Sequence, residues 1–282
     1  MAGIWRIGFI VLAFAVVTLP LLPLQMIAHR LERLWHKALP HWWQKFMCRL
    51  LGLKVTVSGT LAEGRPLLLI SNHVSWSDIL VLGSVAEVSF IAKSEVQGWP
   101  LFGSFAKLQR TIFIERDRRH KTADQASEIA ERLRDGDILV LFAEGTTSDG
   151  NRVLPFKSAL FGAARAALDV KNGEAVDHVL VQPVSVAYTR VQGLPMGRYH
   201  RAVAAWPGSV PLVKHLLGVL HARAIDVSVS FGEPVMFDRT TDRKALSRSF
   251  ESQIRTMTNA ALRFEVDSGA SRDAGNGING AP

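Results

Sequence analysis

The chain has 282 residues, enough for one large α/β domain with accessory segments, and carries a formal net charge of +8 with 48% hydrophobic residues. A basic and apolar chain without zinc-finger spacing, an RNA-binding aromatic signature or a helix-turn-helix pattern favours an anionic membrane surface over nucleic acid as its partner. The single cysteine, Cys48, excludes an internal disulfide, and nine histidines without paired spacing predict no metal site.

The N-terminal segment predicts a membrane anchor. Residues 7–28 contain no charged side chain and are long enough to cross a bilayer as a helix of ~20 residues. Pro20 and Pro23 each remove a backbone donor, so a re-entrant or monotopic insertion fits the pattern as well as a true span does. A signal peptide is the rival interpretation, but the apolar run is long and has no evident small-residue cleavage site.

The flanks of this segment set its expected orientation. Arg6 alone precedes the apolar run, whereas Arg30, Arg33 and Lys37 follow it closely. The positive-inside rule then predicts a domain that faces the cytoplasm on a bacterial-type inner membrane. Residues 30–53 alternate charged with bulky apolar and tryptophan side chains, which is typical of an interfacial amphipathic helix, although a helix packed on the domain shows the same pattern. We assign residues 1–53 to the anchor and this helix.

Residues 54–265 alternate strand-like and helix-like runs, which predicts an α/β domain with a mostly parallel central sheet flanked by helices. A loop with a short helix is expected over 95–108. The expected strands are 55–58, 66–70, 88–92, 111–115, 138–142, 178–186, 200–208 and 224–231, and the expected helices follow Asp78 and cover 122–134, 158–168 and 242–264. Residues 266–282 are rich in Gly, Ser, Asp and Asn and are expected to be a disordered tail.

The stretch from Ser71 to Asp78 contains the strongest candidate for chemistry. It joins a buried strand to a helix, and four residues separate His73 from Asp78. Five residues along a helix correspond to about 500° of rotation, so the two side chains meet only if His73 lies in the loop and Asp78 in the first helical turn. A histidine held by a carboxylate at a strand end makes a general base. The residues expected to cap the helix are Asn72, Ser75 and Ser77.

Three further polar clusters accompany predicted strands. Arg116 lies at the end of strand 111–115, Glu144-Gly145-Thr146-Thr147 follows strand 138–142, and Gln182-Pro183-Val184 interrupts strand 178–186. Open α/β sheets place their ligand crevice along the carboxyl ends of the strands. Several clusters on one such edge therefore indicate a single site.

These residues predict acyl transfer to a hydroxyl group. His73 takes the hydroxyl proton in this interpretation, while Asp78 fixes the imidazole tautomer and stabilises the imidazolium. An activated thioester donor needs no covalent enzyme intermediate, and no cofactor is expected. Gly145 is expected to let the backbone approach a ligand closely, and Thr146 and Thr147 to donate to a phosphate or carbonyl oxygen. Glu144 is expected to bind an acceptor hydroxyl or orient a neighbouring helix. Arg116 is expected to bind an anionic headgroup or a carrier phosphate.

Each assignment has a structural alternative. A histidine near an aspartate is often only a structural hydrogen bond, Glu-Gly-Thr after a strand can be a simple turn, the run from Arg116 to Lys121 can be a solvated basic turn, and Pro183 can mark a strand edge or bulge. A serine hydrolase with Ser75 as nucleophile is disfavoured because no G-x-S-x-G elbow is present. A non-catalytic membrane scaffold leaves the polar groups along one sheet edge unexplained.

The same residues resemble the four sequence blocks of the glycerolipid (PlsC-like) acyltransferase family. Asn72-His73-Val74-Ser75-Trp76-Ser77-Asp78 resembles the N-H-x-S-x-x-D block, and Ile112-Phe113-Ile114-Glu115-Arg116 resembles the block that ends in a substrate-binding arginine. Phe142-Ala143-Glu144-Gly145-Thr146-Thr147-Ser148 and Val181-Gln182-Pro183-Val184 resemble the third and fourth blocks, over roughly residues 50–235 in all. The resemblance implies a cytoplasm-facing membrane enzyme that moves a fatty acyl chain from acyl carrier protein or coenzyme A to a lysolipid, with Pro183 in the substrate-binding set.

Two positions depart from the family pattern. Ala143 replaces the usual proline, and Thr147 replaces the arginine expected beside the acceptor's phosphate. Without that bidentate cation the case for lysophosphatidic acid weakens, although Arg152 or Lys157 can compensate. The run from Glu144 to Arg152 is also similar to the branch that acylates lyso-ornithine lipid, a phosphorus-free aminolipid. The favoured acceptor is therefore lyso-ornithine lipid, and the alternatives are 1-acyl-sn-glycerol-3-phosphate or the use of both acceptors.

Overall fold

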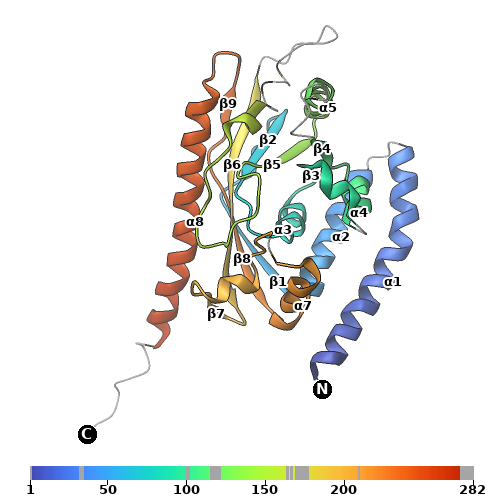
Figure 1. The fold of residues 1–282 in the computed structure, drawn as a ribbon, viewed down its shortest axis with the longest axis vertical. Coiled ribbons are helices and arrows are strands. Elements are labelled where there is room, and N and C mark those ends of the chain that lie inside the picture. Colours follow the sequence, from blue (N-terminus) through green and yellow to red (C-terminus); the bar gives the residue numbers. More distant parts are fainter. Residues whose placement is uncertain are drawn as a thin grey trace.

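The computed structural model describes residues 2–31, 35–99, 102–114, 122–162, 165, 168, 178–208 and 210–273. A central sheet separates two helical layers (Figure 1), which confirms the predicted α/β class with an N-terminal apolar helix. The strand order is β1-β8-β6-β2-β5-β3-β4, with β7 and β9 paired to β6.

The strands and their pairing agree with the expected mostly parallel sheet. The strands of the main path are β1 (Leu53–Ser58), β2 (Leu67–Ser71), β3 (Val88–Lys93), β4 (Ile112–Ile114), β5 (Ile138–Phe142), β6 (Val179–Val191) and β8 (Ile225–Phe231), and the short strands are β7 (Leu194–Pro195) and β9 (Val235–Phe237). β2 is parallel to both β5 and β6, whereas β8 runs antiparallel to β6. β2 and β5 are buried along their whole length because both faces of the sheet are covered.

Alternate residues of the central strands build two separate hydrophobic cores. Leu67 and Leu69 of β2 pack in the core beneath α2 (Trp35–Leu51), α3 (Asp78–Val85) and α7 (Leu212–Ala222). Leu68 and Ile70 face the opposite core, which is closed by α5 (Thr122–Arg134) and α8 (Arg243–Asp273). This alternation follows from the two-residue period of a strand and fixes which face each side chain covers.

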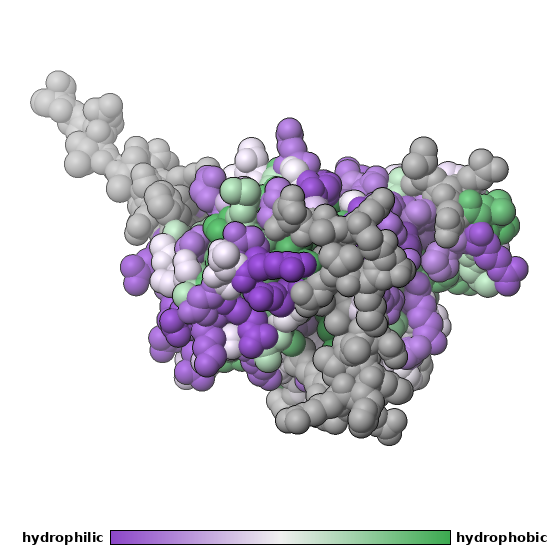
Figure 2. Space-filling view, turned by 90° about the horizontal axis from the view of Figure 1, so that it is seen from above, coloured by the Kyte–Doolittle hydropathy of each residue, from purple (hydrophilic) through white to green (hydrophobic). Residues whose placement is uncertain are grey.

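Helix α1 (Ala2–Arg30) runs unbroken through Pro20 and Pro23 and lies alongside α2 and α4 (Phe102–Leu108). Its polarity is inverted relative to a surface helix, because the polar residues Thr18 and Gln25 are buried against the domain. The exposed residues of this helix include Trp5, Phe9, Leu12, Val16 and Leu19. Figure 2 shows hydrophobic residues gathered at the edge of the molecule where Figure 1 places α1.

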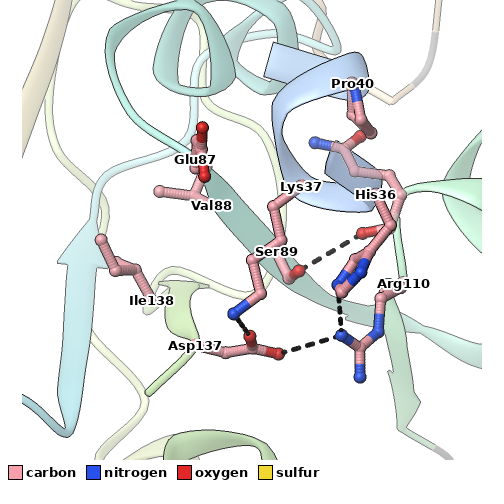
Figure 3. A pocket seen from close by; sticks show the side chains of 10 residues that line it. His36, Lys37, Pro40, Glu87, Val88, Ser89, Arg110, Asp137 and Ile138 are labelled. Carbon is pink, nitrogen blue, oxygen red and sulfur yellow. Dashed lines mark hydrogen bonds and ion pairs between the residues drawn. The ribbon is translucent and has the colours of Figure 1, made fainter. Parts of the chain in front are cut away.

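An ionic cluster fastens α2 to the amino-terminal edge of the sheet. Asp137, directly before β5, lies 2.5 Å from Lys37 Nζ of α2 (Figure 3). It also bonds Arg132 of α5. Burial alone would raise the pKa of Asp137, but the two cations hold that pKa below its ordinary value. A small cavity beside this cluster is lined by His36 and Arg110, which contact each other at 2.8 Å. This cavity lies at the opposite end of β5 from the predicted catalytic edge, so we assign its residues a structural role.

Three predicted elements differ in the structure. The strand expected over 200–208 is wrong, because residues His200–Val203 form a 3-10 turn, η4, instead. Helix α7 follows it and was not predicted, since its apolar sequence lacks a distinctive cap. The segment after Ser158 begins as a 3-10 turn, η3 (Ser158–Phe161), and α8 continues to Asp273, past the expected start of the tail at residue 266. Residues 274–282 of that tail lie outside the described part of the chain. The predicted short helix over 95–108 corresponds to η1 (Ser94–Gly98) followed by α4.

Candidate active site

His73 and Asp78 meet as the strand–loop–helix pattern predicts. His73 lies in the loop after β2, Asp78 is the first residue of α3, and His73 Nδ1 is 2.8 Å from Asp78 Oδ2. The Asp78 side chain is completely buried, whereas 18% of the His73 side chain is exposed. Among the described residues none is hydrogen-bonded to His73 Nε2, so this nitrogen is available to a ligand.

Asp78 is held by four donors. Its Oδ2 accepts hydrogen bonds from the backbone N–H groups of Val74 and Ser75 at 2.7 and 3.0 Å, in addition to the His73 contact. Its Oδ1 accepts a hydrogen bond from the Tyr188 hydroxyl at 2.8 Å. Burial and the neighbouring Asp78 raise the pKa of Tyr188 well above its usual value, so the phenol remains protonated and donates. The carboxylate is thereby fixed in one orientation toward the imidazole.

The predicted capping by serine and asparagine side chains is wrong. Ser77 makes no side-chain cap bond, because its Oγ pairs with Tyr188 Oη at 2.7 Å. Asn72 instead spans to β6, donating to Val186 O at 2.9 Å and accepting from Val186 N at 2.8 Å. The first N–H group of α3, that of Asp78, donates to the backbone carbonyl of Ser75 at 3.0 Å, and Ser75 Oγ is buried with no hydrogen-bond partner in the described part of the chain.

The turn after β5 forms the other wall of the site. The His73 ring stacks on Phe142, with centroids 3.9 Å apart, and the His73 backbone N–H donates to Glu144 Oε1 at 3.1 Å. Ser148 N in turn donates to His73 O at 2.8 Å. Glu144 therefore binds the backbone of the loop that carries His73.

Glu144 is almost completely buried, which gives it an unusual protonation equilibrium. Desolvation raises the pKa of its carboxyl to about 8, against the lowering effect of the hydrogen bonds from the backbone of His73 and Leu154. The charges of Asp78 and Glu251 raise this pKa further. Near neutral pH the group is largely protonated, so it adds little negative charge beside His73.

The other predicted residues are distributed unevenly around this centre. Gly145 adopts a positive φ of +69° in the turn after β5, a conformation that a glycine permits, and it is followed by the exposed Thr146 and half-buried Thr147. Pro183 is buried in β6 at the level of Ile70, between the residues that pair with β9 and those that pair with β8. Because Pro183 pairs with neither β8 nor β9, its missing N–H group removes no hydrogen bond between these strands. Arg116 lies outside the described residues.

Tyr188 is the residue of the candidate site that the sequence did not predict. β6 continues beyond the level of Ser71, where β2 ends, and this extension carries Tyr188 to Asp78. A tyrosine inside a buried apolar strand needs a partner for its hydroxyl, and that requirement is the signal that was present in the sequence.

Comparison with known proteins adds an independent line of evidence. The profile of the Acyltransferase family matches residues 53–187. The chain is 55% identical over 262 residues to a lyso-ornithine lipid O-acyltransferase of Brucella abortus (strain 2308), covering 93% of this chain and 97% of that protein. A second lyso-ornithine lipid O-acyltransferase, from Rhizobium meliloti (strain 1021), is 47% identical over 277 residues, covering 98% and 94%.

A solved structure shares the fold. The crystal structure of the 1-acyl-sn-glycerophosphate (LPA) acyltransferase PlsC from Thermotoga maritima superposes with a TM-score of 0.61 at 22% identity, covering 92% of this chain and 94% of that chain.

Proposed function

Because the chain belongs to the acyltransferase family, we propose that it transfers a fatty acyl chain from a thioester donor to the hydroxyl of lyso-ornithine lipid. The protein is an acyltransferase that acts on a lysolipid, and the proposal concerns the acceptor, the donor and the residue roles. The observation that carries the residue roles is the 2.8 Å contact between His73 Nδ1 and Asp78 Oδ2, with Nε2 remaining for the acceptor.

The proposed reaction needs one base. His73 Nε2 removes the proton from the acceptor hydroxyl as its oxygen attacks the thioester carbonyl carbon, and the imidazolium that forms is stabilised by Asp78. When the tetrahedral intermediate collapses, the carbon–sulfur bond breaks and the leaving thiolate recovers the proton from His73. A thioester is activated enough to be attacked directly, so neither an enzyme nucleophile nor a cofactor is required.

The acceptor is proposed from two observations. Two relatives at 55% and 47% identity, each matched over more than nine-tenths of this chain, are named lyso-ornithine lipid O-acyltransferases. Thr147 stands at the position where the glycerolipid pattern has an arginine for a phosphomonoester, so no bidentate cation is provided there. The proposed thioester carrier is acyl carrier protein or coenzyme A, and Arg116 is proposed to bind the carrier or headgroup phosphate.

The anchor is proposed to lie within one leaflet rather than to cross the bilayer. α1 is long and apolar enough for a span, but both of its ends contact the same domain. Near its start Arg6 donates to Leu220 O and Arg223 O, and near its end Gln25 donates to His36 O and Leu108 O. A crossing would carry α7 and its charged neighbours through hydrocarbon, which is expensive. The outward apolar face of α1 supports burial in the cytoplasmic leaflet of the inner membrane.

A single set of assays tests the proposal. The purified enzyme is offered lyso-ornithine lipid or lysophosphatidic acid, each with acyl carrier protein and coenzyme A thioesters. His73→Ala is compared with His178→Ala, a change at an exposed histidine directly before β6. We expect turnover of lyso-ornithine lipid that is lost in His73→Ala and kept in His178→Ala. Acyl transfer by His73→Ala would refute the role of the base, and exclusive use of lysophosphatidic acid would refute the acceptor.

A further inference from the structure

A partly buried arginine that makes no ion pair with a described residue lies near the loop that carries His73. Arg201 in η4 donates from Nη1 to Asn151 Oδ1 at 2.7 Å and from Nη2 to Met196 O at 3.1 Å. Both partners are neutral, and its Nε is buried without a hydrogen-bond partner. Within the described part of the chain no carboxylate lies within ion-pair distance of this guanidinium. A desolvated cation in such a setting is stabilised by an anion from outside the chain.

The position of this arginine is set by Gly150. The backbone of Gly150 has a φ of +73°, and a Cβ there would lie 3.1 Å from Val74 Cγ1, 3.3 Å from Ala205 Cβ and 3.6 Å from Arg201 Cδ. Val74 directly follows His73 in the chain. Gly150 therefore lies between Val74 and the stem of Arg201, so one residue separates Arg201 from the loop that carries His73.

An acidic group accompanies Arg201 at a fixed separation. The Asn151 amide donates to Asp149 Oδ2 at 3.2 Å while its carbonyl accepts from Arg201, so one asparagine side chain links the two charges and holds them apart. The Asn151 backbone N–H bonds Asp149 Oδ1 at 3.0 Å. Asp149 is exposed and has no ion-pair partner among the described residues. The pair thus presents one positive and one negative charge side by side.

We propose that Arg201 and Asp149 recognise the zwitterionic headgroup of the acceptor, Arg201 binding its carboxylate and Asp149 its ammonium group. Ornithine has one carboxyl and two amino groups, so a lipid attached through one amide keeps a carboxylate and an ammonium. The arrangement also discriminates, because a phosphomonoester dianion placed on Arg201 is repelled by Asp149. This inference rests on the proposed acceptor, and it supplies the headgroup cation that Thr147 does not.

The role can be separated from simple support of the loop by changing substrate and protein together. Arg201→Ala and Asp149→Asn are assayed with lyso-ornithine lipid, with its carboxyl methyl ester and with its N-acetylated amine. Arg198→Ala, at an exposed arginine of the same segment, is the matched control. We expect Arg201→Ala to lower kcat/KM for the free carboxylate by roughly tenfold to hundredfold, through KM, and to change it less than about threefold for the methyl ester. Asp149→Asn is expected to lower kcat/KM for the free amine only.

The wild-type and variant results report on different claims. Turnover of lyso-ornithine lipid by the wild type tests the proposed function, and the substrate dependence of the losses tests the headgroup contacts. Equal losses on the carboxylate and the methyl ester would overturn the inference while leaving the proposed function intact. Asp149→Asn is further expected to raise the rate with lysophosphatidic acid, because it removes a repelling charge. If Asp149→Asn acylates lysophosphatidic acid no faster than the wild type does, Asp149 does not exclude the phosphomonoester headgroup.

Discussion

Replacing Asp78 by asparagine isolates the charge that stabilises the His73 imidazolium. The substituted amide can accept from Val74 N and Ser75 N through its oxygen and can donate to Tyr188 Oη, so most of the present hydrogen bonds have a counterpart. The carboxylate is completely buried and lies 2.8 Å from the imidazole, with charge centres about 4 Å apart. At an effective dielectric constant of about 20, the attraction is roughly 4 kcal/mol. Its loss predicts a decrease in kcat of about a thousandfold.

The assay is kcat for acyl transfer at saturating donor and acceptor, together with the unfolding free energy from denaturant titration. We expect the unfolding free energy of Asp78→Asn to stay within about 2 kcal/mol of wild type, since the hydrogen bonds are largely conserved. Asp135→Asn, at an exposed aspartate after α5, serves as the control and should keep full activity. A folded Asp78→Asn enzyme with kcat within tenfold of wild type would refute the electrostatic role of Asp78.

Three other changes test neighbouring contacts. Ser75→Ala removes a buried hydroxyl that has no hydrogen-bond partner in the described part of the chain, so kcat should stay within about threefold of wild type. A decrease in kcat of more than about a hundredfold would instead support Ser75 as a nucleophile. Tyr188→Phe leaves Asp78 Oδ1 without its hydrogen-bond donor, so denaturant titration should show an unfolding free energy lower by about 1–3 kcal/mol. An unchanged unfolding free energy would contradict the importance of this hydrogen bond. The pKa of Glu144 is about 8 in the folded protein, raised from 4.5. Between pH 4.5 and 8 the folded protein therefore binds up to one more proton than the unfolded chain, so the free energy of unfolding should fall by a few kcal/mol as the pH rises over this range. Glu144→Gln should abolish this fall, measured by denaturation at pH 5 and 8.5, and an unaltered pH dependence in that variant would show that other groups cause it.

Local sequence was sufficient for the catalytic pair and for most of the sheet. His73 and Asp78 are separated by only four residues, and a strand end followed by a helix start leaves them few relative positions. The strands β2 and β5 are short apolar runs between polar turns, which is the pattern of buried parallel strands. The strand expected over 200–208 failed because that segment is apolar for a different reason: Ala204 and Ala205 are buried in the core beside the catalytic loop.

Only the tertiary structure decided which distant residues support the pair. Tyr188 lies 110 positions after Asp78 in the chain, and Arg201 lies 50 positions after Asn151, so no spacing rule connects them. They come together because β6 extends past the end of β2 and because Gly150 lets its loop pack against the turn after His73. The sequence by itself thus determined the pairing of His73 with Asp78, because only four residues separate them at a strand–helix turn. Recognition of the headgroup depends on charges that long-range packing brings to the same loop, and these were invisible before the chain was folded.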